Sequence, residues 1–559
     1  MKAARTIAQP AARPARSSGT PVTNLPASWR RSTSALALVG QLLVWAALPP
    51  LEWSPLAWLA SVPWVMLIRQ PALWGKRPYV ALWLSSFLFW LAALYWVTLP
   101  HWATAFGWLA VSSYLAFYFA AFIGLSRVAV HALGITPIVA APMVWTGLEF
   151  ARAHFLGGFG MAELSHTQYR WPELIQTSDI FGDYGVSFFI VFVGACMARM
   201  LPGPAARLAW WPALPLAALF AAALAYGHWR TTEQSTRPGP QVALIQGSID
   251  IDLKYDPKQG QQIFDEYFGL SRKAVDDNPD LELIVWPETM FREPWYTFDK
   301  DFRPAANVHW TPAQVEARSR NAVESTVARL DVPCLLGVDT VHYTPGGIEN
   351  FNTALFTDRK GHVEGRYDKC HLVPFGEYVP FAETFPWLYR LTPLPGGSRA
   401  GAGPLAIQTG QARYAVNICY ENTLGHFVRA QVTQLRSEGQ EPDILVNLTN
   451  DGWFWGSSEL DLHLACAVFR AVECRKPFLI AANTGFSAWI DSSGRIMAQG
   501  RRRATDVIVA TPAIDQRGSW YLDHGDTPAG LCFLASGGLV FVGLRQRRRE
   551  RKKPVPASI

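Results

Sequence analysis

Residues 79–99 read YVALWLSSFLFWLAALYWVTL and contain no charged side chain. A helix that crosses a membrane needs roughly 20 mostly apolar residues, so this stretch is long enough to span. Outward from it, the full set of apolar stretches is 34–50, 51–68, 79–99, 105–127, 134–150, 184–200, 207–226 and 526–544. Buried helices of a soluble protein are a poor explanation for so many apolar stretches so close together in the sequence. The sequence therefore predicts a membrane-embedded α-helical bundle of about eight spans.

The charges that lie between the spans predict how the bundle is oriented in the membrane. Residues 1–33 hold six Lys or Arg and no acid, and residues 545–559 hold seven Lys or Arg and one Glu. Basic segments beside apolar spans mark the cytoplasmic side. With both tails inside, the acid-rich 151–183 loop falls outside. Basic tails can also bind nucleic acid, but this placement favours the membrane interpretation, and no nucleic-acid partner is expected.

Composition separates the predicted membrane part from a part that faces water. Charged residues make up 17% of the chain, against about 25% in soluble proteins, and they are scarce from about residue 32 to 226. The seven scattered cysteines show no CxxC spacing, so neither a disulfide framework nor a zinc module is expected. We expect a disordered basic tail at 1–32, seven spans at 33–227, a water-facing domain at 228–525, a last span at 526–544 and a basic tail at 545–559.

Strand and helix patterns alternate through the water-facing part. Strand-like apolar runs occur at 241–246, 281–286, 333–338, 352–357, 414–418, 443–448, 477–482 and 506–510. Helical patterns occur at 260–276, 312–330, 421–437 and 458–474. This alternation predicts an α/β fold with covered sheets. The aromatic segment 291–310 and the Gly/Pro-rich segment 391–404 read as irregular loops, which are often lids or binding loops.

Cys419 lies at a predicted strand-to-helix junction, in Val416-Asn417-Ile418-Cys419-Tyr420. Amides at a helix N-terminus favour a thiolate and can also hold an oxyanion. A lone cysteine is more often a small buried apolar residue, so this position by itself leaves both interpretations open.

Glu288 and Lys369 are the other two candidates for chemistry. Glu288 follows a buried-type strand and could act as a general base, or it could be a solvated acid at the end of the strand. Lys369 begins a stretch dense in aromatic residues, proline and glycine, and could stabilise an oxyanion. Cys370 and His371 suggest a dyad instead, but adjacent residues of an extended segment point to opposite faces.

The order of these motifs resembles the nitrilase superfamily: Trp286-Pro-Glu288, Tyr367-Asp-Lys369 and Cys419-Tyr-Glu421. The runs PFGEYVPF at 374–381 and NDGWF at 450–454, after seven apolar stretches, narrow the resemblance to the apolipoprotein N-acyltransferase family. That resemblance implies a four-layer αββα nitrilase-like domain facing the periplasm, on an eight-helix base in the bacterial inner membrane.

The resemblance also implies roles for individual residues. Cys419 matches the nucleophile, Glu288 the general base and Lys369 the oxyanion stabiliser. Three further residues match supporting or substrate-binding positions, and the second of them offers a backbone amide to the oxyanion: Glu377, Tyr420 and Glu421. The family often has tryptophan at the position of Tyr255, which is a departure here. His463 and Trp453 are expected to pack around the site.

The implied reaction is the last step of bacterial lipoprotein maturation. A phospholipid would donate an acyl chain to Cys419 as a thioester, and the α-amino group of a diacylglyceryl-cysteine apolipoprotein would accept it. No metal, nucleotide or other cofactor is expected in this chemistry. Segment 291–310 is the candidate gate for the acyl chain. The alternatives are a membrane-tethered nitrilase-like amidase and a non-enzymatic membrane binding protein, although a transporter usually needs more ionisable groups inside its spans.

Overall fold

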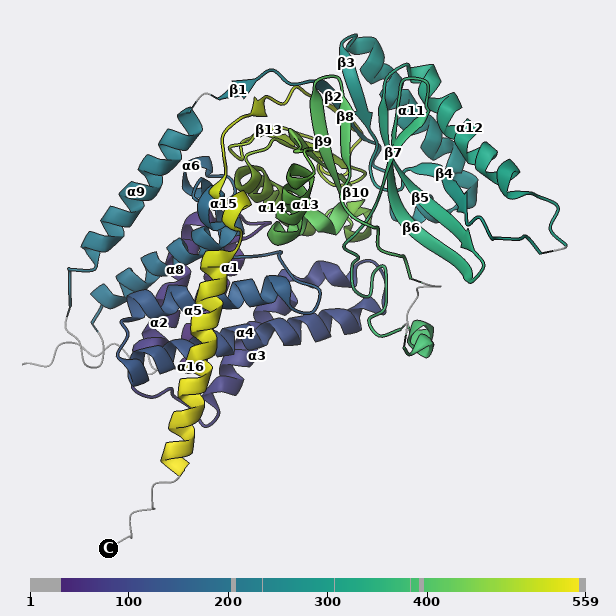
Figure 1. The fold of residues 1–559 in the computed structure, drawn as a ribbon. Helices are drawn as coiled ribbons and strands as arrows, with labels where there is room; N and C mark the ends of the chain where they lie inside the picture. The colour runs from purple at the N-terminus through teal and green to yellow at the C-terminus, as the bar shows by residue number, and fades with distance from the viewer. Residues whose placement is uncertain are drawn as a thin grey trace, which may run out of the picture.

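The computed structural model describes residues 32–202, 208–233, 235–305, 307–382, 384–391 and 397–551. A helical part and an α/β part lie side by side, as Figure 1 shows. The disordered tail predicted for 1–32 falls almost wholly outside the described residues, as does part of the tail predicted for 545–559. The segment 391–404 is described only in part.

Each predicted apolar stretch is largely helical. The helices are α1 Thr33–Ala47, α2 Ala57–Arg69, α3 Pro78–Ala93, α4 Thr104–Leu133, α5 Pro137–His154, α8 Asp183–Met200, α9 Ala213–Thr232 and α16 Thr527–Arg551. By length and composition, the described residues contain three helices able to cross a membrane: α4, α8 and the Thr527–Arg548 part of α16. At about 1.5 Å per residue, α1 and α2 are shorter than a bilayer core of about 30 Å. The eight-span bundle therefore stays a prediction.

Aromatic packing and close backbone approach hold the helical part together. Trp64 of α2 stacks on Trp145 of α5, with ring centroids 5.1 Å apart. Phe119 of α4 meets Trp64 edge-on at 5.2 Å. A Cβ at Gly147 of α5 would lie 2.6 Å from the carbonyl oxygen of Cys532, so only glycine lets α16 approach this closely. Small residues commonly permit such helix crossings in membranes.

The α/β part contains two large sheets. One has the order β13-β12-β11-β10-β9-β8, with strands Ile496–Gln499, Ala488–Ile490, Phe478–Ala482, Ile444–Thr449, Ala412–Ile418 and Ala406–Thr409. The other has the order β14-β2-β3-β5-β6-β7, with strands Asp506–Ala510, Gln241–Gln246, Leu281–Val285, Cys334–Thr344, Gly347–Thr357 and Val363–Asp368. β4 (Phe291–Phe298) pairs with β5 beside that path. A small antiparallel pair joins β1 (Thr236–Arg237) to β15 (Ile514–Asp515).

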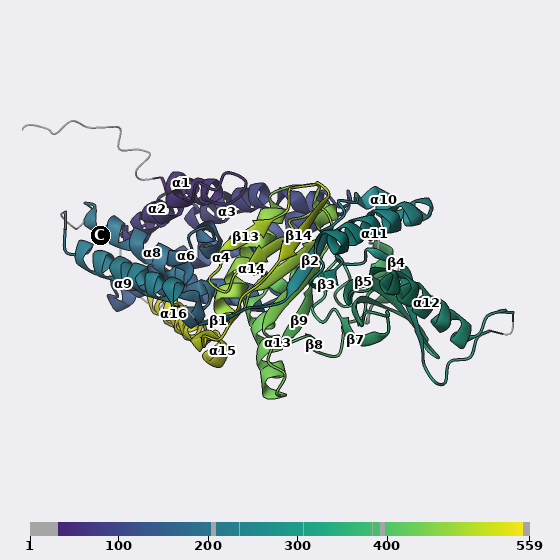
Figure 2. The ribbon, with the colours of Figure 1, turned by 90° about the horizontal axis from the view of Figure 1, so that it is seen from above.

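Alternating side chains of the strands build four layers. Val242 and Leu244 of β2 lie in the core between the two sheets. Ala243 and Ile245 point to the opposite face, which α11 (Gly260–Asp277) and α12 (Pro312–Leu330) cover. This is the period of two that strand geometry imposes. On the far face of the other sheet lie α13 (Gly425–Ser437) and α14 (Glu459–Cys474), between that sheet and the helical part (Figures 1 and 2). The αββα sandwich is confirmed.

The prediction of an irregular loop over 291–310 is wrong for its first half. Residues 291–298 form β4, which runs parallel to β5. The rings of Phe298 and Tyr343 stack with centroids 4.9 Å apart, and Trp310 packs on Tyr343 at 5.9 Å. Aromatic residues favour pleated, half-buried surfaces, and here that preference produced an added strand. Its rings pack locally against β5, which does not support the acyl gate expected from this segment.

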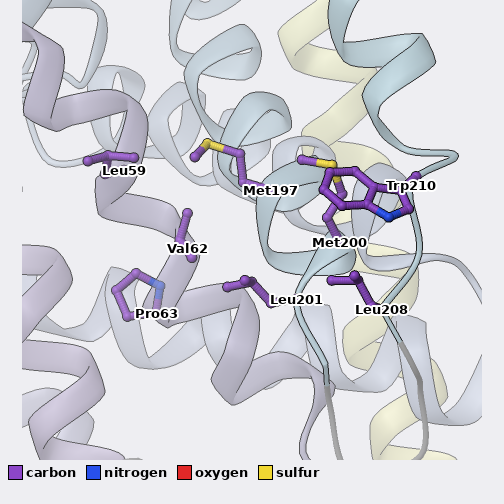
Figure 3. Close-up of a pocket in the computed structure, with 8 residues that line it drawn as sticks. All are labelled: Leu59, Val62, Pro63, Met197, Met200, Leu201, Leu208 and Trp210. Atoms are coloured by element: carbon purple, nitrogen blue, oxygen red, sulfur yellow. The ribbon is translucent and has the colours of Figure 1, made fainter.

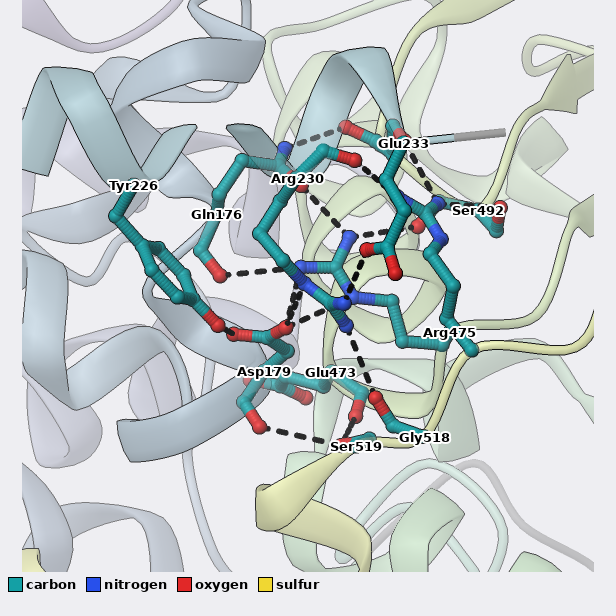
Figure 4. A network of polar contacts seen from close by, with 12 residues as sticks. Gln176, Asp179, Tyr226, Arg230, Glu233, Glu473, Arg475, Ser492, Gly518 and Ser519 are labelled. Carbon is teal, nitrogen blue, oxygen red and sulfur yellow. Dashed lines mark hydrogen bonds and ion pairs between the residues drawn. The ribbon is translucent and has the colours of Figure 1, made fainter. Parts of the chain in front are cut away.

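A buried charge network joins the two parts of the chain (Figure 4). The Asp179 carboxylate, on α7 (Ser178–Phe181), accepts from Tyr226 Oη at 2.8 Å and from Arg230 Nε at 2.9 Å, both on α9. It also accepts from Arg475 Nη2, just after α14, at 2.6 Å. Arg475 is 0% exposed. Arginine is almost never fully buried unless paired. The network therefore fixes the α/β layers to α9, the helix that precedes them.

Candidate active site

Cys419 stands at a strained turn at the end of β9. It opens the 3-10 helix η7 (Cys419–Thr423) with a backbone φ of +51°. Thr289, next to Glu288, has a φ of +55°. Positive φ is uncommon outside glycine, costs on the order of 1–3 kcal/mol and clusters at functional sites. The parallel pairing of β9 and β10 brings the ends of these strands to one edge of the sheet.

Glu288 lies just beyond β3 of the facing sheet and bridges the two sheets. Its Oε1 accepts from Asn352 Nδ2 at 2.6 Å. Its Oε2 accepts from the backbone N–H of Asn450, beyond β10, at 2.9 Å. The side chain is buried. The solvated strand-end interpretation is therefore wrong, because two donors hold this carboxylate in the interior.

Lys369 lies between two carboxylates. Its Nζ is 2.8 Å from Glu377 Oε1 and 3.7 Å from Glu288 Oε1. Only 1% of Lys369 is exposed. Burial by itself lowers the pKa of Lys369, but the nearby carboxylates of Glu377 and Glu288 outweigh it and raise the pKa. The ammonium therefore stays charged, as an oxyanion stabiliser must.

The surroundings of Cys419 favour the neutral thiol over the thiolate. Burial raises its pKa well above the ordinary value, Glu288 raises it further, and Lys369 only partly offsets these effects. The sequence suggested that helix amides favour a thiolate here, whereas burial and the charge of Glu288 act in the opposite direction. Burial disfavours the charged form of a thiol. A base must therefore remove the proton during attack.

Glu421 joins the segment around Lys369 to the turn at Cys419 through hydrogen bonds. Its two oxygens accept from the backbone N–H groups of Ile418 at 2.6 Å, Cys370 at 2.7 Å and His371 at 2.9 Å. Tyr367 Oη donates to the same carboxyl group at 2.8 Å. Burial raises the pKa of Glu421 to about 7, although these hydrogen bonds act in the opposite direction. One side chain thus sets the position of Lys369 relative to Cys419.

We expect Glu421→Gln to lower the rate of acyl transfer by roughly 100-fold, because a displacement of about 1 Å in a catalytic group can cost that much. The amide NH₂ of glutamine would face backbone donors and leave some of them unpaired. The rate constant of a single turnover, measured beside the melting temperature, checks this. Glu441→Gln is the control, since Glu441 pairs with Lys476 away from the site. A rate loss that merely follows a loss of folded protein would contradict a positioning role.

Sequence reasoning missed Asn447 in this site and expected His463 only to pack around it. The Cys419 carbonyl oxygen accepts from Asn447 Nδ2 at 3.1 Å and lies 3.1 Å from His463 Nε2. His463 Nδ1 lies 3.2 Å from Asp451 Oδ1. Burial lowers the pKa of His463, but Asp451 and the Cys419 carbonyl raise it above the ordinary value, so the ring can donate to both. Asparagines inside otherwise apolar strands, as at 447, were the available signal.

The neighbours of the predicted nucleophile and lysine contact the helical part. Tyr420 Oη donates to the carbonyl of Gly158 at 2.6 Å, and His371 Nε2 lies 2.9 Å from the carbonyl of Gly157. Cys370 Sγ instead donates to Asp368 O at 3.3 Å. Cys370 and His371 therefore have different partners, and the Cys–His dyad suggested by their adjacency does not form.

An apolar cavity lies elsewhere, in the helical part (Figure 3). It has a volume of about 380 Å³ and is lined by Leu59, Val62, Pro63, Met197, Met200, Leu201, Leu208 and Trp210. No ionisable side chain occurs among these described lining residues. The cavity therefore lacks the groups that acyl transfer needs, and it is separate from the candidate active site.

Comparison with known proteins assigns each of the two parts of the chain to a protein family. Residues 40–196 match the apolipoprotein N-acyltransferase N-terminal domain, and residues 241–521 match the carbon-nitrogen hydrolase family. An apolipoprotein N-acyltransferase of Geobacter metallireducens is 34% identical over 529 residues, which cover 92% of this chain and 95% of that protein. The chain belongs to the apolipoprotein N-acyltransferase family. A family member from Rhodopirellula baltica is 31% identical, covering 94% of this chain and 100% of that protein.

Two solved structures are similar to about half of the chain. Nit3 of Saccharomyces cerevisiae, a member of the nitrilase superfamily, is 17% identical with a TM-score of 0.34, over 53% of this chain and 97% of Nit3. An amidase from Nesterenkonia is 15% identical with a TM-score of 0.33, over 51% of this chain and 95% of the amidase. Membership of the apolipoprotein N-acyltransferase family makes the chain an acyltransferase enzyme. Glu288, Lys369 and Cys419 all fall in its carbon-nitrogen hydrolase region.

Proposed function

We propose that this enzyme moves an acyl chain from a phospholipid to the α-amino group of a diacylglyceryl-cysteine apolipoprotein, through a thioester on Cys419. The observation that carries the proposal is the position of a partly buried thiol within electrostatic reach of one base and one ammonium. Those groups are Glu288 and Lys369. Family membership supports the acceptor, and the helical part supports a lipid donor.

In the first half-reaction Glu288 takes the proton of the Cys419 thiol, and the sulfur attacks the ester carbonyl carbon of the phospholipid. Negative charge develops on the carbonyl oxygen, and Lys369 with the backbone amide of Tyr420 stabilises it. The ester C–O bond then breaks. Glu288 returns the proton to the departing oxygen, so that a lysophospholipid leaves and a thioester remains.

In the second half-reaction the neutral α-amino group of the apolipoprotein attacks the thioester carbonyl. Glu288 accepts a proton from the nitrogen, the C–S bond breaks, and the proton returns to the sulfur of Cys419. Each half-reaction conserves atoms and protons within the chain's own side chains and its two substrates. Glu377 holds Lys369 in place at 2.8 Å throughout.

We further propose that about eight helices anchor the enzyme in the bacterial inner membrane, with segment 33–227 embedded and segment 228–525 in the periplasm. Large apolar side chains are exposed on the loop that follows Lys369, including Phe375, Phe381 and Trp387. Aromatic residues of this kind favour the membrane–water interface. The loop is therefore our candidate for the lipid-facing rim of the site.

The test is to incubate the purified enzyme with a phospholipid carrying an isotope-labelled acyl chain and a diacylglyceryl-cysteine peptide. We expect one lysophospholipid to form for each labelled N-acyl peptide. The same peptide with an acetylated α-amino group is the control and should remain unmodified. Free fatty acid formed at equal rates with either peptide would overturn transfer in favour of hydrolysis. Cleavage of short soluble amides without lipid transfer would favour the tethered amidase.

A further inference from the structure

The backbone carbonyl of Cys419 is held by side chains that the proposed reaction does not use. Its oxygen accepts from Asn447 Nδ2 at 3.1 Å and from His463 Nε2 at 3.1 Å. Asn447 lies on β10 and His463 on α14. His463 Nδ1 in turn lies 3.2 Å from Asp451 Oδ1. We refer to Asn447, His463 and Asp451 as the carbonyl clamp.

The carbonyl clamp lies on the opposite side of its sheet from the reacting thiol. Val446 and Leu448 of β10 lie in the core between the two sheets, and the Cys419 side chain packs at the edge of that core. Leu445 packs in the other core cluster, together with the side chains of α14. Asn447 is two residues from Leu445, so it points the same way, toward α14. The carbonyl of Cys419 is therefore held from the α14 side.

The geometry of the peptide bond turns this hold into a direction for the next N–H group. The peptide is planar and trans, so the N–H of Tyr420 points the opposite way from the carbonyl of Cys419. It therefore points away from α14, toward the side of the thiol. Tyr420 is the second residue of η7, and the first N–H groups of a helix have no acceptor inside it. Hydrogen bonds on the carbonyl also polarise the same amide and strengthen its N–H as a donor.

Asp451 fixes the His463 ring in the orientation that the clamp needs. A carbonyl oxygen can only accept, so Nε2 of His463 carries a hydrogen. Two lone pairs facing each other would repel, so a hydrogen also lies between Nδ1 and Asp451 Oδ1. Thr449 Oγ1 donates to that same oxygen at 2.8 Å and holds the carboxyl group in turn.

The clamp is continuous in the chain with the residue that holds the proposed base. Asn450, which directly precedes Asp451, donates its backbone N–H to Glu288 Oε2 at 2.9 Å. Both residues follow the end of β10, the strand that carries Asn447. The end of β10 therefore positions the base and the peptide of the nucleophile together.

A buried histidine beside an aspartate can also be no more than part of the packing. The chain offers an example in His166, whose Nε2 lies 3.9 Å from Asp183 Oδ2. Among the described residues, neither ring nitrogen of His166 has a hydrogen-bond partner. His463 differs because it bonds to the backbone of Cys419, where φ is +51°. Such a conformation persists only when the surrounding structure holds it.

We propose that Asn447 and His463, with Asp451 behind His463, are positioning residues for acyl transfer. They hold the Cys419–Tyr420 peptide so that the N–H of Tyr420 meets the oxyanion that develops on the acyl donor. This role rests on the proposed function, in which that N–H and Lys369 share the oxyanion. The clamp touches no substrate, and no bond to it forms or breaks during the reaction.

The test compares two reactions of Cys419 in the full chain in detergent. p-Nitrophenyl butyrate acylates the thiol through a tetrahedral oxyanion, whereas iodoacetamide alkylates it by direct displacement and forms none. Peptide mass mapping restricts both rates to Cys419. Removal of an oxyanion donor costs about 10²–10³-fold and a misdirected donor costs less, so we expect His463→Asn to slow acylation by roughly 10- to 100-fold. Alkylation, and the ester concentration that gives half the maximal rate, should change little.

Two further variants test the hydrogen bond itself. A glutamine amide can reach the position of Nε2 and donate to the carbonyl, whereas an asparagine amide reaches only as far as Nδ1. We therefore expect His463→Gln to recover most of the acylation rate. Asn447→Leu has a similar volume and no donor, so it should slow acylation as His463→Asn does. His166→Asn is the matched control at the other buried histidine and should keep both rates.

Equal slowing of acylation and alkylation in His463→Asn would overturn this role, because the clamp would then serve the thiol or the fold. An unaltered acylation rate in His463→Asn, with its melting temperature showing a folded chain, would overturn it as well. A chain that p-nitrophenyl butyrate acylates at Cys419 but phospholipid does not would overturn the proposed function instead. The variants would then still decide the role of the clamp.

Discussion

Replacing Cys419 with alanine is expected to abolish acyl transfer, with a loss on the order of 10⁴-fold or more, because the covalent route then has no nucleophile. Intact mass after incubation with phospholipid and no acceptor should show one added acyl chain on the unaltered enzyme. Hydroxylamine should release it as a thioester. The Cys419→Ala variant should gain no mass.

Cys370→Ala is the matched control for that experiment. Cys370 is partly buried at the edge of the same core cluster as Cys419, and its side chain contacts Asp368 O at 3.3 Å. We expect the Cys370→Ala variant to form the adduct at close to the unaltered rate. An adduct that survives Cys419→Ala and disappears in Cys370→Ala would move the nucleophile to the neighbouring segment.

Replacing Lys369 with methionine is expected to slow acylation of Cys419 by roughly 10³-fold, since the developing oxyanion loses its ammonium partner. The change also leaves the carboxylates of Glu288 and Glu377 close together without the charge that separates them. Breaking a buried pair on one side costs about 3–5 kcal/mol of stability. Single-turnover acylation and urea unfolding, measured on the same sample, should show both losses.

Two further variants separate catalysis from stability. Lys369→Arg keeps the positive charge but changes its geometry, so we expect most of the stability and only a small part of the rate to return. Lys476→Met removes another buried lysine, whose partner Glu441 lies near the starts of the strands rather than their ends. That control should retain its rate. Unchanged acylation in folded Lys369→Met would exclude Lys369 as the oxyanion stabiliser.

The α/β layers were predictable because their signals are local. The strand at 241–246 is apolar and β-branched over a short run, and the helix at 312–330 has its own period and a capping box at Thr311. Local patterns of this kind do not depend on distant partners. The 291–310 segment failed for the opposite reason, because β4 forms only when β5 offers it an edge.

The reacting residues were predictable in identity but not in environment. Glu288, Lys369 and Cys419 each stand just after a strand in a motif that the family resemblance identified. Nothing local showed that Asn352 and the amide of Asn450 would hold the carboxylate of Glu288. Both partners are far apart from Glu288 along the chain: Asn352 reaches it across strands of the same sheet, and Asn450 reaches it because the two sheets pack face to face.

The sequence by itself determined which stretches are apolar, which alternate as strands, and which residues could react, since these properties reside in short runs of side chains. Only the tertiary structure decided that Cys419 lies close to Glu288 and Lys369 and that Glu421 joins the segment around Lys369 to the turn at Cys419. The approach of distant segments sets those contacts. It depends on how complete layers pack, and a single sequence does not encode that packing locally.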